Sequence, residues 1–497
     1  MKIKTCSRRK FLGTMAAAGA LPLLGQSIPS QKTGSDSLRK MPNTKPRNLV
    51  FILSDDHRYD FMSFMGKPSF LQTPGLDRLA REGAHLQNSF VTTSLCSPSR
   101  ASILTGMYSH HHGVVDNDSP APEGVVYFPQ YLQQHGYKTA FIGKWHMGHH
   151  TDEKQPGFDH WVSFPGQGVY YNPVFNVNGE EVERKGYITD ILTDYAADWL
   201  KQQGDQPFLL YLSHKAVHAM FEPAKRHLGL YENKTPEYPP SMADTAANYY
   251  LKPDWVKEQR NSWHGVDYMY HGEIDFDTFY RRYCETLLAL DEGIARVRDT
   301  LETLDLADST LLLYMGDNGF CLGEHGLIDK RQMYEESIRV PLLAWAPGLI
   351  PPGTQIPQMI QNIDIAPTLL TTAGLQPPEN MDGRSFLPLL QGKTIPWRNE
   401  IFYEYYWERP FPQTPTMHGI RTDEWKYVMY HGIWDLDELY NLEADPREMN
   451  NLIREPEQLE RIKEFRDRVY GWLEQTGGMQ IPLRRAPLWQ AAKRKPE

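Results

Sequence analysis

The sequence predicts an α/β fold in which helices flank a central, mostly parallel sheet. Four short runs are continuously apolar and rich in residues that favour β-structure: residues 48–53, 139–142, 208–212 and 310–315. Such runs are typical of strands buried on both faces of a parallel sheet. Helical patterns separate them, most clearly over residues 283–304, where apolar side chains recur at helical spacing. Strands that alternate with helices indicate a doubly wound sheet.

The length and the C-terminal patterns predict a second, smaller unit. A chain of 497 residues exceeds one hydrophobic core, because single cores stop growing at about 250–300 residues. Beyond a large domain over residues 47–380, strand-like patterns at 401–406 and 425–430 precede a helical pattern at 458–476. We therefore expect an α+β subdomain over residues 381–497 that contains an antiparallel sheet and a helix.

Residues 222–279 interrupt the alternation of strands and helices. This stretch is rich in Pro, Trp, Tyr and charged residues. Long irregular segments in compact domains are usually functional or disordered, and the high aromatic content argues against disorder. We expect an insertion that forms one wall of a ligand cleft.

The N-terminal residues match a twin-arginine export signal. Arg8 and Arg9 precede an apolar run that begins after Gly13 and continues through Ala16 to Leu24. A run of roughly a dozen residues is too short for a transmembrane helix, which needs about 20. We expect a cleaved signal at residues 1–27, a polar linker at 28–46 and an exported bacterial protein, periplasmic or extracellular, without a transmembrane span. An uncleaved anchor is the alternative.

The charge of the chain excludes one large class of partners. The formal net charge is −10, and the predicted signal contains basic but no acidic residues, so the remainder is more acidic still. This balance argues against nucleic-acid binding. An anionic ligand would need a local cationic pocket.

The cysteines do not form a closed disulfide framework. Of the four cysteines, Cys6 lies in the predicted signal, and Cys96, Cys284 and Cys321 remain, an odd number. The sequence allows either a Cys284–Cys321 disulfide bridge or two buried free thiols.

Polar side chains follow each of the four apolar runs directly. They are Asp55 and Asp56 after the first run, Lys144 and His146 after the second, His218 after the third, and Asp317 and Asn318 after the fourth. Ligands of open α/β sheets bind outside the carboxyl ends of the strands, so we expect these side chains at one edge. The four acidic and amide side chains form an all-oxygen set, which suits Ca²⁺ or Mg²⁺ and not zinc. An isolated Asp pair is more often a helix cap or a solvated turn.

Residues 96–106 carry the most specific pattern of the chain, Cys-Ser-Pro-Ser-Arg-Ala-Ser-Ile-Leu-Thr-Gly. A bare Cys-x-Pro-x-Arg is more often a loop cysteine beside a proline turn. With its helical continuation, the segment resembles the signature of the formylglycine-dependent sulfatases, in which this cysteine is oxidised to an aldehyde. The resemblance spans nearly all of the chain after the signal. It implies an alkaline-phosphatase-like fold, hydrolysis of sulfate esters, and a maturation enzyme that generates formylglycine from Cys96.

The same resemblance implies the roles of the individual residues. Residues 143–148, Gly-Lys-Trp-His-Met-Gly, are similar to the family's Gly-Lys-Trp-His-Leu-Gly. The implied metal ligands are Asp55, Asp56, Cys96, Asp317 and Asn318, with calcium favoured and magnesium as the alternative. The implied catalytic side chains are Cys96, Arg100, Lys144, His146, His218 and Lys330. His218 is our first choice for the proton donor, since imidazole titrates near the working pH.

Two further segments point to the substrate. Residues 329–335 and 415–423 look most like glycan sulfatases that act on N-acetylglucosamine 6-sulfate. We expect a sulfated carbohydrate substrate whose sulfate contacts Lys144, His218 and Lys330. Arg331 and His418 are candidate sugar contacts, with a salt bridge or packing as the alternative for each.

Two rival functions stay open at this point. Phosphate or phosphonate ester hydrolases of the same superfamily share the fold. A non-catalytic glycan-binding relative would keep the fold and never mature Cys96.

Overall fold

A ten-stranded sheet forms the centre of the computed structural model, which describes residues 38–42, 45–118, 120–148 and 151–482. Its strand order is β12-β2-β11-β8-β1-β7-β3-β4-β5-β6. The predicted signal and most of the predicted linker lie outside the described residues.

The four apolar runs form four neighbouring strands. These are β1 (Asn48–Ser54), β3 (Lys138–Lys144), β7 (Phe208–Ser213) and β8 (Thr310–Gly316). β1 pairs in parallel with β7 and β8, and β3 pairs in parallel with β7. Their carboxyl ends therefore lie at one edge of the sheet, and the predicted mostly parallel sheet is confirmed.

Antiparallel strands flank this parallel centre. β11 (Leu342–Trp345) runs antiparallel to β8 and to β2 (Ala84–Phe90), and β12 (Thr354–Gln361) is parallel to β2. On the other side β4 is parallel to β3, and β5 and β6 follow in antiparallel order. Their bounds are His160–Phe164, Val174–Val177 and Glu180–Glu183.

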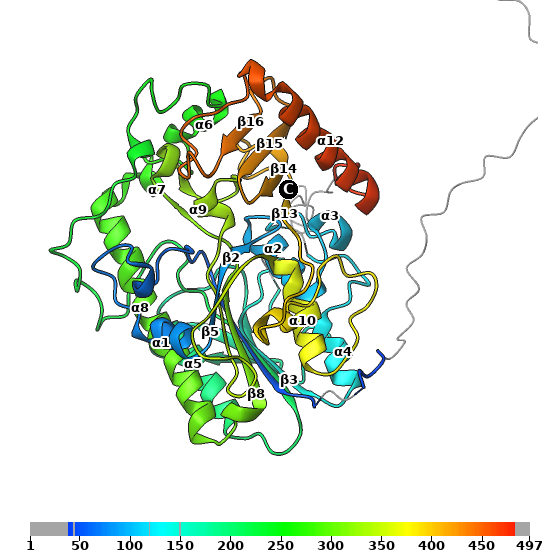
Figure 1. Cartoon of the computed structure of the whole chain (residues 1–497). Helices are drawn as coiled ribbons and strands as arrows, with labels where there is room; N and C mark the ends of the chain where they lie inside the picture. Colours follow the sequence, from blue (N-terminus) through cyan, green and yellow to red (C-terminus); the bar gives the residue numbers. More distant parts are fainter. Residues whose placement is uncertain (1–37, 43–44, 119, 149–150, 483–497) are drawn as a thin grey trace, which may run out of the picture. The chain divides into compact units, whose positions relative to one another are not determined.

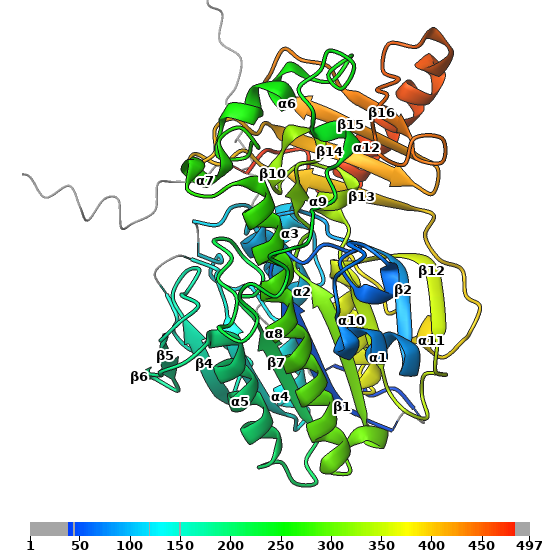
Figure 2. The ribbon, with the colours of Figure 1, turned by 90° about the vertical axis from the view of Figure 1, so that its left-hand side faces the viewer.

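Helices cover both faces of the sheet (Figures 1 and 2). Successive side chains of a strand point to opposite faces. Val50 and Ile52 of β1 therefore enter one core, and Leu49, Phe51 and Leu53 enter the other. The first core includes α1 (Pro74–Glu82), α5 (Ile188–Leu200) and α8 (Phe276–Thr303), and the second includes α2 (Cys96–Thr105), α4 (Phe128–Gln134) and α10 (Ile365–Thr372).

The helix predicted over residues 283–304 is α8, and it begins earlier than predicted. Asp275 is its N-cap, and the carboxylate accepts a hydrogen bond of 2.8 Å from the backbone N–H of Thr278. An Asp at this position satisfies a backbone donor that the first helical turn leaves unpaired. The apolar periodicity alone did not reveal this start.

The C-terminal part contains the predicted antiparallel sheet. Its strands are β13 (Glu400–Tyr405), β14 (Thr416–Thr422), β15 (Trp425–His431) and β16 (Glu438–Asn441), in that order. Side chains of α12 (Leu459–Thr476) pack on this sheet in a core of their own. β13 and β15 match the predicted strands, whereas β14 and β16 were not foreseen. The domain boundary near residue 380 stays a prediction.

The segment over residues 222–279 is irregular, with short helices α6 (Asp254–Glu258) and α7 (Met269–Gly272). Figures 1 and 2 both show α6 beside the small sheet. Trp255 and Val256 of α6 belong to a core that also holds side chains of β13 and β14. The segment therefore packs against the C-terminal sheet.

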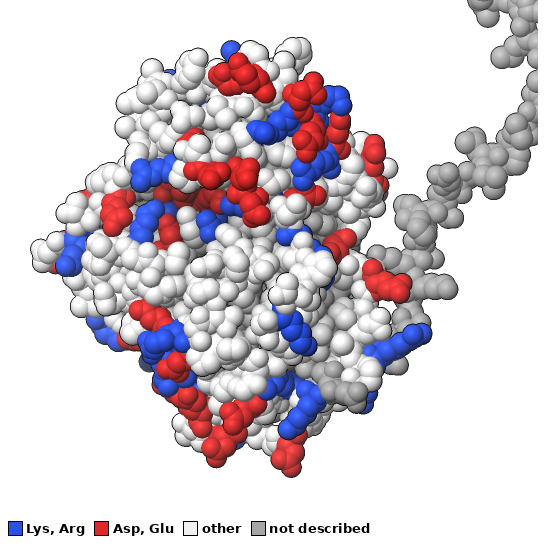
Figure 3. All heavy atoms as spheres, viewed as in Figure 1, with Lys and Arg blue, Asp and Glu red and all other residues white. Residues whose placement is uncertain are grey.

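The surface mixes charges of both signs. On the face drawn in Figure 3, acidic and basic side chains alternate instead of forming one large field of a single sign. Among the described residues, no helix combines the length and the apolar character needed to cross a membrane.

Glu404 of β13 links the small sheet to α3 (Ser109–His112) through hydrogen bonds. Its buried carboxylate accepts hydrogen bonds from His110 Nδ1 at 2.7 Å and from the Tyr406 hydroxyl at 2.9 Å. His110 Nε2 lies 3.0 Å from Thr476 Oγ1 of α12. Although burial raises the pKa of Glu404, His110 and the hydroxyl of Tyr406 outweigh it and hold the pKa at about 2.

We expect Glu404→Gln to lower the free energy of unfolding by up to about 3 kcal/mol at neutral pH. A carboxyl with a lowered folded-state pKa stabilises the fold fully above its unfolded pKa of about 4.3, and this contribution is lost as the pH falls toward 2. The difference between wild type and Glu404→Gln should thus shrink below pH 4.5 in urea unfolding curves. The exposed Glu457→Gln is the control, and a difference that grows on acidification would contradict this account.

Candidate active site

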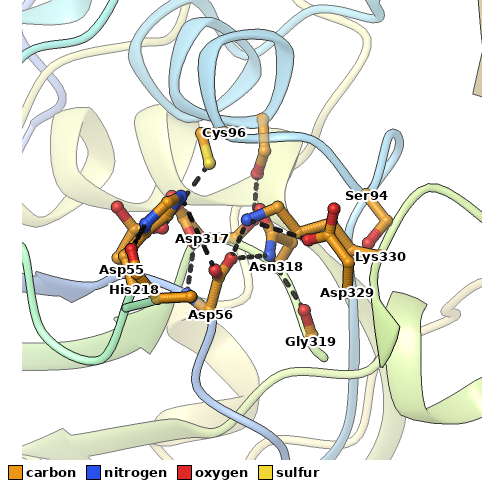
Figure 4. A network of polar contacts seen from close by, with 12 residues as sticks. Asp55, Asp56, Ser94, Cys96, His218, Asp317, Asn318, Gly319, Asp329 and Lys330 are labelled. Carbon is orange, nitrogen blue, oxygen red and sulfur yellow. Dashed lines mark hydrogen bonds and ion pairs between the residues drawn. The ribbon is translucent and has the colours of Figure 1, made fainter. Parts of the chain in front are cut away.

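Four neighbouring strands deliver polar side chains to one edge of the sheet. Asp55 and Asp56 follow β1, and Asp317 and Asn318 follow β8. Figure 4 shows these side chains gathered below Cys96, which projects from the start of α2. The structure thereby brings together the predicted oxygen set and the predicted thiol.

The sequence of α2 explains why this helix can enter the site. All ten of its residues are buried, and its Ser and Ala side chains are small enough to let neighbouring backbone approach. Asn117 Oδ1 accepts a hydrogen bond of 2.9 Å from the backbone N–H of Ser97, which the helix itself leaves unpaired. Gly106 ends the helix at φ 70°, in the left-handed region that glycine adopts without strain.

Cys96 lies fully buried at the first position of α2. Its Sγ is 3.5 Å from Asp55 Oδ1. Burial, followed by the negative charge of Asp55, raises the pKa of the thiol far above its usual range. The environment therefore does not favour a thiolate.

Arg100, one helical turn after Cys96, ties the strand ends to each other. Its Nε donates to Asp317 Oδ2 at 2.9 Å, and one terminal nitrogen lies 3.2 Å from Asp55 Oδ2. The other donates to the Lys144 carbonyl at 2.8 Å and to Ser213 Oγ at 2.6 Å. Charge-assisted hydrogen bonds are stronger than neutral ones, so these contacts fix both aspartates.

Three carboxylates meet at one point of the site. Ligand oxygens of Asp55, Asp56 and Asp317 all lie within 4.8 Å of one another. Burial, together with the charges of Asp55 and Asp317, raises the pKa of Asp56 to about 8 despite Lys330. Burial and the charge of Asp55 also raise the pKa of Asp317.

Two oxygens of this cluster have no hydrogen-bond partner although they are buried. They are Asp56 Oδ2 and Asn318 Oδ1. The Asn318 amide nitrogen donates to Asp56 Oδ1 at 2.6 Å, which directs its oxygen away from that contact. Unpaired buried oxygens are costly, and hard oxygen ligands are what Ca²⁺ and Mg²⁺ prefer. The residues present therefore fit a divalent cation.

Lysines oppose the carboxylates on two sides. Lys144, at the end of β3, forms an ion pair with Asp55. Lys330, which follows the short strand β10 (Ile328–Asp329), forms one with Asp56. β10 pairs with β9 (Cys321–Leu322), and this hairpin carries Lys330 back toward the strand ends.

His218 stands at the opening of the site. Its Nδ1 donates to the Ala219 carbonyl, so Nε2 faces the carboxylates, 3.9 Å from Asp56 Oδ2. Its side chain is 19% exposed, whereas that of Lys144 is fully buried. Burial, followed by the charges of Lys330 and Lys144, lowers the pKa of His218 well below its usual value.

His146 approaches the site from the end of β3, with its Nδ1 3.4 Å from Ser97 Oγ. Two further residues near the site were not predicted: Lys215 follows β7 as the predicted residues follow their strands, whereas no pattern in the sequence marks Gln167. Gln167, in the loop between β4 and β5, contacts both Lys144 and His146. Lys215 is buried over the ring of Tyr170 at 4.6 Å, and burial followed by the charge of Lys144 lowers its pKa to about 8.

The two candidate sugar contacts are buried and have partners in the protein. Arg331 Nε donates to Glu408 Oε1 at 2.8 Å, and its guanidinium lies 3.9 Å from the ring centre of Phe411. His418 lies on β14, with its Nδ1 2.9 Å from His431 Nε2. Arg331 borders the cluster through its neighbour Lys330, whereas the described contacts of His418 lie in the small sheet and α12.

The remaining cysteines are free thiols among the described residues. Cys284 lies in α8 and Cys321 in β9, and both are buried. The bridge left open by the sequence does not form.

A family model described as sulfatase matches residues 47–375. The chain belongs to the sulfatase family. A second model, N-sulphoglucosamine sulphohydrolase, C-terminal, matches residues 323–475. The resemblance carried by the Cys96 motif is thereby confirmed, and members of this family generally use a formylglycine and a divalent metal.

Similar proteins share both sequence and fold with this sulfatase. An N-acetylglucosamine-6-O-sulfatase of Bacteroides thetaiotaomicron is 36% identical over 481 residues, which cover 85% of each chain. The human N-acetylglucosamine-6-sulfatase is 28% identical over 83% of this chain and 82% of its own. A solved structure in complex with its substrate D-glucosamine-2-N,6-O-disulfate has a TM-score of 0.80 at 33% identity, covering 89% of this chain and all of the other.

We expect Asp56→Asn to weaken the binding of a divalent cation at least roughly ten-fold, because it removes one charge from an all-oxygen site. The measurement is calorimetric titration of chelator-treated protein with Ca²⁺ and with Mg²⁺. The exposed Asp308→Asn should bind like wild type. Wild-type affinity in Asp56→Asn, or no binding by the wild type, would show that the cluster is not a cation site.

Proposed function

We propose that this sulfatase removes the 6-O-sulfate of a glucosamine-type sugar in a glycan. One observation carries the reaction type: three carboxylates and two unpartnered oxygens converge below the buried thiol of Cys96, with two lysines and an arginine around them. With a divalent cation bound, such a site would carry the local positive charge that an anionic substrate needs in a chain whose overall charge is negative.

The residues fit the two groups that the family uses. We propose that calcium is held by the oxygens of Asp55, Asp56, Asp317 and Asn318, where it would supply positive charge to polarise the sulfate ester. Cys96 is the precursor, and its Sγ marks the place of the reactive oxygens. Formylglycine at this position supplies, as its hydrate, one hydroxyl for attack on sulfur and a second whose deprotonation releases the sulfate.

The lysines position and neutralise the sulfate. Lys144 and Lys330 approach the carboxylates from two sides, so their ammonium groups flank the space below Cys96. Cations placed where negative charge develops lower the barrier, and they hold the ester in line with the nucleophile. Arg100 orients the aspartates and not the sulfate, because its guanidinium already donates to the aspartates and to strand-end oxygens.

We propose that His218 donates a proton to the departing sugar oxygen once the negative charge of a bound sulfate ester offsets Lys330 and Lys144. Burial and the charges of these two lysines lower the pKa of His218 in the free protein. Its Nδ1 is committed to the Ala219 carbonyl, so only Nε2 can serve the substrate. The side chain is partly exposed, which supports a role at the side of the site from which the sugar would leave. A proton delivered there avoids an alkoxide leaving group.

Support for the sugar comes from the similar proteins. The relative that is 36% identical is an N-acetylglucosamine-6-O-sulfatase, and the solved structure at 33% identity holds D-glucosamine-2-N,6-O-disulfate. We infer the same substrate class for this chain. Arg331 and His418 stay predictions as sugar contacts.

We also infer export through a twin-arginine signal. Support comes from the basic pair Arg8 and Arg9 before the apolar run, and from relatives called extracellular sulfatases in Caenorhabditis elegans and Drosophila melanogaster. A periplasmic or extracellular site would require formylglycine formation by a maturation enzyme of the host.

Maturation of Cys96 should be visible in the intact mass of active enzyme. Conversion of the thiol to an aldehyde loses H₂S and gains oxygen, a decrease of about 18 Da. Cys96→Ala should abolish turnover and retain Ca²⁺ binding measured by calorimetry. Active enzyme with an unmodified Cys96, or turnover by Cys96→Ala, would refute the proposed nucleophile.

The substrate class is tested with a panel of sulfated sugars. We expect sulfate release, followed by ion chromatography, to be fastest from N-acetylglucosamine 6-sulfate or D-glucosamine-2-N,6-O-disulfate and slow from N-acetylgalactosamine 4-sulfate. The hydrolysis rates of the sulfate and phosphate esters of 4-nitrophenol distinguish a sulfatase from a phosphate ester hydrolase. A preference for phosphate would overturn the reaction type, and a preference for the 4-sulfate would overturn the sugar.

A further inference from the structure

Gln167 links two side chains that the reaction needs. It lies in the loop between β4 and β5, far in sequence from the strand ends. Its Oε1 accepts a hydrogen bond from Lys144 Nζ, and its Nε2 lies 3.1 Å from His146 Nε2. The amide therefore bridges the lysine that faces Asp55 and the histidine that faces α2.

The direction of each hydrogen bond follows from the chemistry of the partners. A lysine ammonium can only donate, so the amide oxygen of Gln167 must face Lys144. The amide NH₂ then faces His146 and donates to Nε2. A neutral imidazole that accepts at Nε2 carries its hydrogen on Nδ1.

The far side of His146 is consistent with this direction. Nδ1 lies 3.4 Å from Ser97 Oγ, and the Ser97 hydroxyl donates its own hydrogen to the His146 carbonyl. The oxygen of Ser97 is therefore an acceptor for Nδ1–H. A chain of donors thus runs in one direction from Lys144 to the first turn of α2.

We infer that Gln167 is a positioning residue that fixes His146 as the Nδ1–H tautomer, an inference that rests on the proposed function. The imidazole then presents an N–H, and not a lone pair, toward Ser97, the neighbour of the residue that would carry the reactive oxygens. A neutral amide also leaves the positive charge of Lys144 available to the sulfate. Asparagine is one methylene shorter and would not span both partners.

Two substitutions separate this role from simple packing. Gln167→Glu has nearly the same shape, but its carboxylate can only accept, so His146 would turn to Nε2–H or become charged. Gln167→Met has a similar length and makes neither hydrogen bond, so His146 would populate both tautomers. We expect kcat to fall in the order wild type, Gln167→Met, Gln167→Glu, with Gln167→Glu lower than wild type by roughly 10- to 100-fold. A packing role predicts that the isosteric Gln167→Glu retains more activity than Gln167→Met.

The second readout does not require activity. Two-bond ¹H–¹⁵N spectra of histidine-labelled protein with unmodified Cys96 report which ring nitrogen carries the hydrogen, and His146→Gln identifies the signal of His146. We expect Nδ1–H in wild type and protonated Nε2 in Gln167→Glu. Gln155→Glu, a nearby glutamine bonded to the Glu153 carbonyl, is the control and should resemble wild type in both measurements.

Nε2–H in the wild type, or a higher kcat in Gln167→Glu than in Gln167→Met, would overturn the inference. A wild type that shows Nδ1–H but releases no sulfate from any sugar would sink the proposed function and leave the assigned tautomer standing.

Discussion

The buried guanidinium of Arg100 is the contact on which the reactive edge of the sheet depends. It bonds side chains or carbonyls at the ends of four neighbouring strands, and it is nearly inaccessible to solvent. A guanidinium keeps its charge in proteins and offers five donors in a rigid plane. Burying such a charge without partners is strongly unfavourable. A buried guanidinium whose donors are all hydrogen-bonded instead offsets the negative charge of its carboxylate partners. Removal of Arg100 would leave Asp55 and Asp317 buried without that compensation.

Because Arg100 supplies this compensation, the edge can hold more negative charge than a core normally tolerates. An imbalance remains: the raised pKa of Asp56 shows that its ionised form is disfavoured, and one oxygen each of Asp56 and Asn318 lacks a donor. Each buried unsatisfied oxygen costs about 1–3 kcal/mol. Buried oxygens without partners break the rule that buried polar groups are hydrogen-bonded, and proteins tolerate such exceptions at functional sites. A hard dication is the ligand whose charge and coordination remove that imbalance.

Patterns that depend on burial could be predicted from the sequence, and contacts between distant loops could not. The four central strands are buried on both faces, so they appear as apolar runs, and the side chains that follow them share an edge by the geometry of parallel sheets. β2 lies next to the edge strand β12 and carries the polar pair Gln87 and Asn88, so it lacks that signal. Gln167 reaches the site from an irregular loop, and no periodicity marks a single glutamine. His418 was placed by resemblance alone, and its position on β14 depends on how the small sheet packs.

The same long-range packing makes the C-terminal part a component of the reactive edge. Asp329, next to Lys330, lies 2.9 Å from His264 of the irregular segment and 2.5 Å from Arg331. Arg331 is bonded in turn to Glu408, in the loop between β13 and β14. Ion pairs to the irregular segment and to the C-terminal part, which both lie outside the parallel sheet, therefore hold the residues next to Lys330, whose ammonium faces Asp56. A change in either part is therefore expected to displace the Lys330 ammonium through this chain of ion pairs, and with it the proposed contact to the sulfate.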